Sequence, residues 1–186
     1  EDQILVQVRD AHRAAEGQGL IGKLLEPLFQ TAFHIGKDVR TRTAISSRPI
    51  SVTSLALERL HRRYEGARPS IAIVGAGEMS SLAARGAREL GFDVRFVVNR
   101  SRERGEKLAS EVGAQWVDLG ALSHGELPID ALISATSRPG YVAEAEALVR
   151  MATRAPLGCG LLAIDLAVPR DFAPCTDAKV ELVDLD

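Results

Sequence analysis

A glycine-rich turn at residues 75–80 has the clearest chemical pattern in this sequence. The apolar run 71–74 leads into Gly75, Gly77 and Ser80, which stand at the spacing Gly-x-Gly-x-x-small. Between a strand and a helix, the first glycine permits a tight turn and the second lets a pyrophosphate approach the backbone, while the helix amides stabilise its charge. A turn that binds nothing is the alternative. The pattern favours a dinucleotide site comprising Gly75, Ala76, Gly77, Glu78, Met79 and Ser80.

The next apolar run, 94–98, ends at Asn99, Arg100 and Ser101. A site that prefers NAD normally places an acid here, on the ribose hydroxyls. Arg100 can instead pair with a 2′-phosphate, and Asn99 and Ser101 offer short hydrogen-bonding groups. We therefore predict NADP(H) as the cofactor, with a solvated arginine at a strand end as the alternative.

Two further polar segments follow apolar runs. Small hydroxyl residues around Thr136 would let the nicotinamide half of the dinucleotide lie across the crevice, and a plain polar turn is an equally good interpretation. Asp165 closes the run 161–164 and precedes Pro169 and Arg170. It could form the crevice floor, but we favour structural capping and pairing by Asp165 and Arg170.

No catalytic nucleophile and no metal site are evident. Cys159 and Cys175 are far apart in sequence, with no histidine nearby to activate either, and they form no metal-ligand spacing. We predict structural roles for both. So few cysteines favour a reducing, cytoplasmic location. The chain carries 23 basic and 25 acidic residues, so no global field attracts nucleic acid, and no apolar run predicts a signal peptide or membrane span.

Residues 37–68 carry a local excess of positive charge, with eight basic and three acidic residues. Such a segment could contact RNA phosphates, although a solvated helix face and exposed connector are favoured on spacing alone.

The apolar spacing predicts the elements that position these residues. Two amphipathic helices joined at residues 17–19 are expected, the second ending before Gly36, followed by an extended connector at 37–49 and a third helix that Ser51 caps. After Pro69, short strands alternate with helices. We predict an α/β fold, a doubly wound, mainly parallel Rossmann-like sheet preceded by a helical segment from a second domain, with domains 1–45 and 46–186.

Several strings taken together resemble one family, the glutamyl-tRNA reductases of tetrapyrrole (porphyrin) biosynthesis. They lie at residues 1–8, 36–43, 50–52, 75–80, 99–101 and 165–171. Glu78-Met79 inside the glycine turn and the Ala-Val-Pro-Arg-Asp string at 167–171 are more specific than a general dinucleotide pattern. The resemblance covers nearly the whole chain in order.

The resemblance implies NADPH-dependent reduction of glutamyl-tRNA to glutamate-1-semialdehyde through a cysteine thioester. It also implies that Glu1, Asp2, Gln3 and Gln7 help line the glutamate pocket. The nucleophilic cysteine of the family matches neither Cys159 nor Cys175 and belongs to a motif upstream of this sequence. We therefore expect the isolated chain to bind cofactor without turnover, and any homodimer to form through regions outside it.

This sequence departs from the family pattern at Ser80, Val6 and Arg42, which replace a glycine, a small residue and an acid. A shikimate- or quinate-dehydrogenase-like oxidoreductase, and a non-catalytic dinucleotide-binding regulatory module, are the alternative functions.

Overall fold

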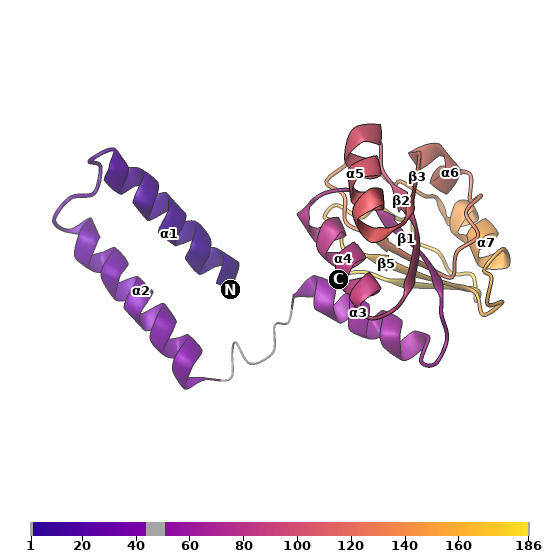
Figure 1. Cartoon of the computed structure of the whole chain (residues 1–186), viewed down its shortest axis with the longest axis horizontal. Coiled ribbons are helices and arrows are strands. Elements are labelled where there is room, and N and C mark those ends of the chain that lie inside the picture. The colour runs from indigo at the N-terminus through magenta and orange to yellow at the C-terminus, as the bar shows by residue number, and fades with distance from the viewer. Residues whose placement is uncertain (1, 44–50, 186) are drawn as a thin grey trace. The chain divides into compact units, whose positions relative to one another are not determined.

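The computed structural model describes residues 2–43 and 51–185 (Figure 1). The chain forms two compact units, which divide between Pro49 and Ile50. Glu1 and the domain boundary expected between residues 45 and 46 lie outside the described residues, so that boundary stays a prediction.

The described part of the first unit is a pair of helices, α1 (Asp2–Gly17) and α2 (Leu25–Arg42). The second helix differs from the expectation, because it begins later and runs through Gly36 to Arg42. Gly36 lies where α2 packs against α1, since a Cβ there would be 2.9 Å from the side chain of Leu5 on α1. Beyond it, the Thr41 hydroxyl donates to the Lys37 carbonyl and Arg42 pairs with Asp38. The expected extended connector is therefore helical as far as Arg42.

The second unit begins with helix α3 (Val52–Arg63), and the Ser51 hydroxyl accepts a hydrogen bond from the Ser54 amide at 3.0 Å, as a helix N-cap does. The predicted cap is confirmed. The strands are β1 (Ser70–Val74), β2 (Asp93–Val98), β3 (Gln115–Val117), β4 (Ala131–Ser134), β5 (Leu161–Asp165) and β6 (Val180–Val183). The other helices are α4 (Glu78–Glu89), α5 (Arg102–Val112), α6 (Leu119–Ser123) and α7 (Ala145–Thr153).

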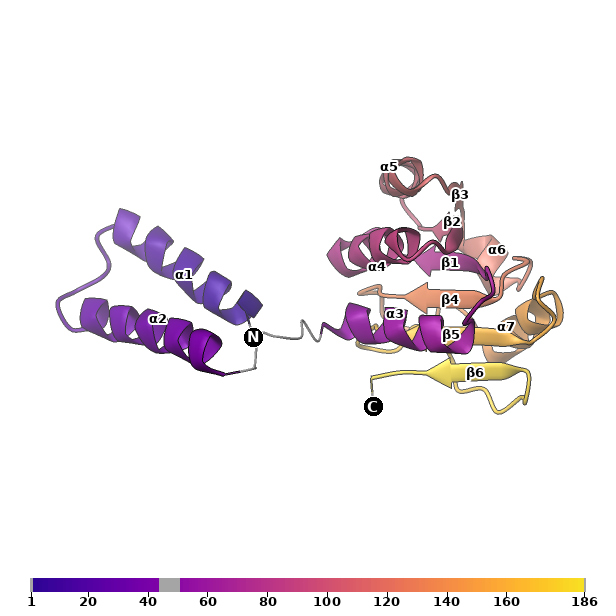
Figure 2. The same ribbon diagram turned by 60° about the horizontal axis from the view of Figure 1, so that its bottom comes forward.

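All the strand pairings are parallel, in the order β3-β2-β1-β4-β5-β6. Alternate residues of β1 point to opposite faces: Ile71 and Ile73 pack with α3, α4 and α5, and Ala72 and Val74 pack with α6 and α7. Figure 2 shows the helices divided between the two faces and β6 at the sheet edge. The predicted α/β, doubly wound fold is confirmed. Its ligand crevice belongs at the carboxyl ends of β1 and β4, where the strand order reverses.

The structure differs from the sequence expectation at two elements of this unit. Helix α6 was not expected, since five residues are too few to show helical periodicity. Helix α7 begins at Ala145 rather than at 142, because the amide of Val142 donates to the carbonyl of Asp171 at 2.6 Å.

Candidate dinucleotide-binding site

The glycine turn connects β1 directly to α4. Gly75 has φ +100°, a backbone conformation that favours glycine, and its amide donates to the carbonyl of Val98 at the end of β2. A Cβ at Gly75 would lie 2.6 Å from the Ser80 hydroxyl and 3.1 Å from the Ala135 carbonyl. Gly77 is the N-cap of α4 and supplies no side-chain cap. The turn is thus tight, and the first-turn amides of the helix are left for another partner.

Ser80 takes the third small position of the motif. Its side chain is buried, and its hydroxyl donates to the carbonyls of Val74 and Ala135 at 3.2 and 3.1 Å. The serine therefore fits the close contact between helix and strands, and it links the glycine turn to the end of β4.

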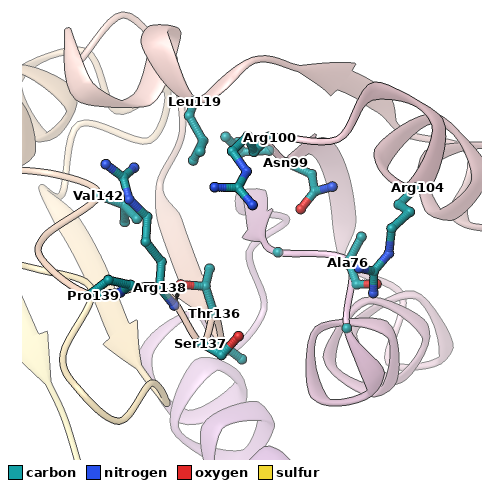
Figure 3. A pocket seen from close by; sticks show the side chains of 14 residues that line it. Ala76, Asn99, Arg100, Arg104, Leu119, Thr136, Ser137, Arg138, Pro139 and Val142 are labelled. Carbon is teal, nitrogen blue, oxygen red and sulfur yellow. Dashed lines mark hydrogen bonds between the residues drawn. The ribbon is translucent and has the colours of Figure 1, made fainter.

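A pocket of about 310 Å³ opens at the carboxyl ends of β1, β2 and β4. Figure 3 shows Arg100 projecting into it after β2, Arg138 on the opposite wall, and Arg104 beside Ala76. Arg104 stands in the first turn of α5 and donates a long hydrogen bond, 3.4 Å, to the Ala76 carbonyl. Three guanidinium groups around one crevice suit a ligand with several phosphates.

The turn that carries Arg100 is held by its neighbours. The Asn99 side-chain amide donates to the carbonyl of Ser101 at 2.8 Å, and the indole N–H of Trp116 donates to the Asn99 carbonyl at 3.0 Å. Gly105 leaves room for the indole, because a Cβ there would lie 2.6 Å from its nitrogen. These contacts fix the backbone from which Arg100 extends.

The structure brings six of the expected cofactor residues to the pocket wall: Gly75, Ala76, Gly77, Asn99, Arg100 and Thr136. The other four do not line it. Glu78 and Met79 are exposed at the start of α4, Ser80 is buried beneath the turn, and Ser101 is the N-cap of α5 without a side-chain cap bond.

Sequence reasoning missed several wall residues, Arg104, Leu119, Arg138 and Val142 among them. Arg104 could have been found by extending the Asn-Arg-Ser string by one helical turn. Arg138 and Val142 lie in a loop, and Leu119 in a short helix, so no periodic pattern marks them.

The segment after β4 is held from below by Asp171. This carboxylate is fully buried and accepts hydrogen bonds from the Ser134 hydroxyl, the Thr136 amide and the Thr136 hydroxyl at 2.5, 3.0 and 2.6 Å. Thr136 therefore lines the pocket and also takes part in a polar turn, and its contact with a nicotinamide stays a prediction.

Asp165 has the structural role that we favoured. Its carboxylate accepts from the amides of Ala167, Asp171 and Phe172 at 3.0, 2.8 and 2.9 Å, and burial raises its pKa above the usual value. Arg170 pairs with Asp184 near the end of the chain. Asp165 thus shapes the loop that carries Asp171.

Cys159 is exposed and Cys175 is half-buried, packed at the rim of the core under α7, and both are free thiols. Within residues 2–43 and 51–185, no group of three His, Cys, Asp or Glu side chains is arranged to hold a metal. No helix in the described part of the chain is long and apolar enough to cross a bilayer.

The basic segment is largely paired where it is described. Arg62 lies against Glu58, and Arg59 and Arg63 both lie against Glu181 on β6. These contacts reduce the positive charge that α3 presents, and contact with RNA by this segment stays a hypothesis.

The expected substrate residues fall at the start of the first unit. Asp2 and Gln3 begin α1, and Gln7 is exposed one turn further on. Glu1 lies outside the described residues.

Two family models match this chain. Residues 1–43 match "Glutamyl-tRNAGlu reductase, N-terminal domain", and residues 54–186 match "Shikimate / quinate 5-dehydrogenase". The second model covers only residues of the second unit and does not extend to residues 1–43. Its name is the same as that of our alternative function, a shikimate- or quinate-dehydrogenase-like oxidoreductase.

Relatives that match across both units include several glutamyl-tRNA reductases. The enzyme of Moorella thermoacetica is 36% identical over 100% of this chain and 43% of its own length, and that of Polaromonas naphthalenivorans is 40% identical over 94% and 41%. The solved structure of glutamyl-tRNA reductase from Methanopyrus kandleri is 29% identical, with a TM-score of 0.66 over 99% of this chain and 47% of that one. The chain spans less than half the length of these relatives. It belongs to the glutamyl-tRNA reductase family, of which it carries the end of the N-terminal domain and the Rossmann-like NAD(P)-binding domain.

Proposed function

We propose that this chain supplies the NADP(H) site of an enzyme that reduces glutamyl-tRNA to glutamate-1-semialdehyde in tetrapyrrole biosynthesis. The observation that carries the cofactor assignment is Arg100, which projects into the pocket at the end of β2 where an NAD site would place an acid. Its guanidinium can form paired hydrogen bonds with a 2′-phosphate, which NAD(H) lacks.

The pocket fits the rest of such a cofactor. The glycine turn leaves space above Gly77, where a Cβ would meet nothing within 4 Å, so a pyrophosphate can approach the backbone. Bound NADPH supplies the hydride that reduces the acyl group. The residues of this chain bind and orient the dinucleotide across the ends of β1, β2 and β4.

The substrate assignment rests on the family. Residues 1–43 match the reductase N-terminal domain, which favours glutamyl-tRNA over shikimate or quinate. Asp2, Gln3 and Gln7, together with Glu1, are proposed to line part of the glutamate pocket. Neither Cys159 nor Cys175 is proposed as the nucleophile.

The cofactor test is a titration of the chain with NADPH, NADP⁺, NADH and NAD⁺, followed by nucleotide fluorescence or heat. We expect selective binding of NADPH and NADP⁺. The variant Arg100→Ala should weaken the binding of NADPH roughly ten- to hundredfold, because one charge-assisted contact is lost. The binding of NADH should stay nearly unchanged. Arg102→Ala is the matched control, since Arg102 pairs with Glu106 and does not line the pocket. Equal weakening of NADPH and NADH by Arg100→Ala would contradict the 2′-phosphate assignment.

The activity test uses the full-length protein with glutamyl-tRNA and measures NADPH oxidation together with release of tRNA. Oxidation that depends on glutamyl-tRNA is expected. Cofactor binding without any such oxidation would favour the non-catalytic regulatory module.

A further inference from the structure

Asp171 is a buried carboxylate whose hydrogen-bond donors come from the segment at the end of β4. Its side chain is fully buried, and no salt bridge to it occurs among the described residues. Its two carboxylate oxygens instead accept hydrogen bonds from two hydroxyls and one amide, on Ser134 and Thr136. A buried carboxylate satisfied in this way holds its donors in one geometry, because leaving any of them unpaired in the interior is costly.

The backbone of Asp171 holds the far end of the same segment. Its carbonyl accepts from the Val142 amide at 2.6 Å, and the neighbouring residue Phe172 forms a parallel bridge with Ala143. One residue therefore fixes both ends of segment 136–142, by its carboxylate at Thr136 and by its carbonyl at Val142.

Segment 136–142 forms one wall of the pocket. Thr136, Ser137, Arg138, Pro139 and Val142 all line it, opposite the glycine turn and Arg100 (Figure 3). Asp165 supports this arrangement from β5, since it accepts from the amides of Asp171 and Phe172. The chain of contacts thus runs from β5 through Asp171 to the pocket wall.

The position of this wall indicates which part of the ligand it serves. In a doubly wound sheet the pyrophosphate lies at the first glycine turn and the adenosine half lies towards the end of β2. The remaining half, with the nicotinamide, then crosses the end of β4. We infer that Asp171 is a positioning residue for the nicotinamide half of the dinucleotide, acting through Thr136 and segment 136–142; this inference rests on the proposed NADP(H) function.

The test compares two ligands on the full chain: NADPH, which has both halves, and adenosine 2′,5′-bisphosphate, which has only the adenosine half. In the variant Asp171→Asn, one acceptor oxygen becomes an amide donor that cannot accept from Thr136 or Ser134. We expect the dissociation constant for NADPH to rise about tenfold and that for the bisphosphate to stay within about twofold. A general loss of structure would instead weaken the binding of both ligands by similar factors.

Asp130→Asn is the matched control. Asp130 is also fully buried, and its carboxylate accepts from the amides of Ser70 and Leu157 at 2.8 Å each. Because Ser70 begins β1 and the pocket lies at the other end of that strand, this variant should leave the ratio of the two affinities unchanged.

Ser134→Ala keeps the inference testable if Asp171→Asn does not fold. Ser134 donates to Asp171 and does not line the pocket. Loss of its hydroxyl should also raise the dissociation constant for NADPH, by a smaller factor than Asp171→Asn does. Equal effects on the two ligands, or no effect on NADPH from either variant, would overturn the inference while the cofactor assignment stands. If the unaltered chain binds neither ligand, the proposed function fails and the inference fails with it.

Discussion

The hydroxyl of Ser80 lies 3.1 Å from the carbonyl oxygen of Ala135, and this hydrogen bond joins the first turn of α4 to the end of β4. The same hydroxyl reaches Val74 at the end of β1. A serine at the third small position of the glycine motif thus connects the two strands that flank the crevice. This contact comes from the helix–strand packing that the motif requires.

Ser80→Ala should lower the free energy of unfolding by about 1 kcal/mol, because a buried hydroxyl that donates to two carbonyls is removed. The measurement is chemical denaturation of the full chain. Ser81→Ala on the same helix is the control and should change stability by less than about 0.5 kcal/mol. Equal effects of the two substitutions would show that the Ser80 hydroxyl contributes nothing specific.

Arg104→Ala should weaken NADPH binding by a few-fold to about tenfold, because it removes one of three guanidinium charges around the pocket. Arg102→Ala makes the same charge change two residues earlier, on a side chain that pairs with Glu106 and lies over Trp116, and should have little effect. Titrations at two salt concentrations check the electrostatic origin, since the effect of Arg104→Ala should shrink as salt rises. Indistinguishable affinities for the two variants would remove Arg104 from the site.

The stability of the protein should depend on pH in the alkaline range because of Tyr64. Its hydroxyl donates to the Asp130 carbonyl at 2.5 Å, and burial raises its pKa above the usual value of 10.0. A tyrosine whose pKa is raised by folding contributes stability that is fully present below pH 10 and is lost as the pH rises above it, because the unfolded chain ionises first. The variant Tyr64→Phe has no such group.

The measurement is the melting temperature of both proteins across the alkaline range. At neutral pH the native chain should have the higher melting temperature, because one buried hydrogen bond adds about 1 kcal/mol to its free energy of unfolding. Its advantage over Tyr64→Phe should decrease above pH 10. A constant difference at all pH values would contradict the assignment, since other alkaline groups titrate in both proteins.

Features that depend on neighbours along the chain could be predicted from the amino-acid sequence. The strands and the glycine turn followed from short apolar runs and from Gly75 and Gly77, whose roles are set by local backbone geometry. Arg100 could be placed at the pocket because it directly follows a strand, and parallel strands end at the same sheet edge.

Contacts between segments that are distant along the chain became visible only in the folded protein. Gly36 looked like a helix end, yet it is the point where Leu5 packs against α2. Asp171 reaches Thr136 across 35 positions, and Trp116 reaches Asn99 across 17. Such pairs leave no periodic trace, because burial and hydrogen bonding depend on which segments the sheet order brings together. The residues after β4 that line the pocket could therefore be identified only from the fold.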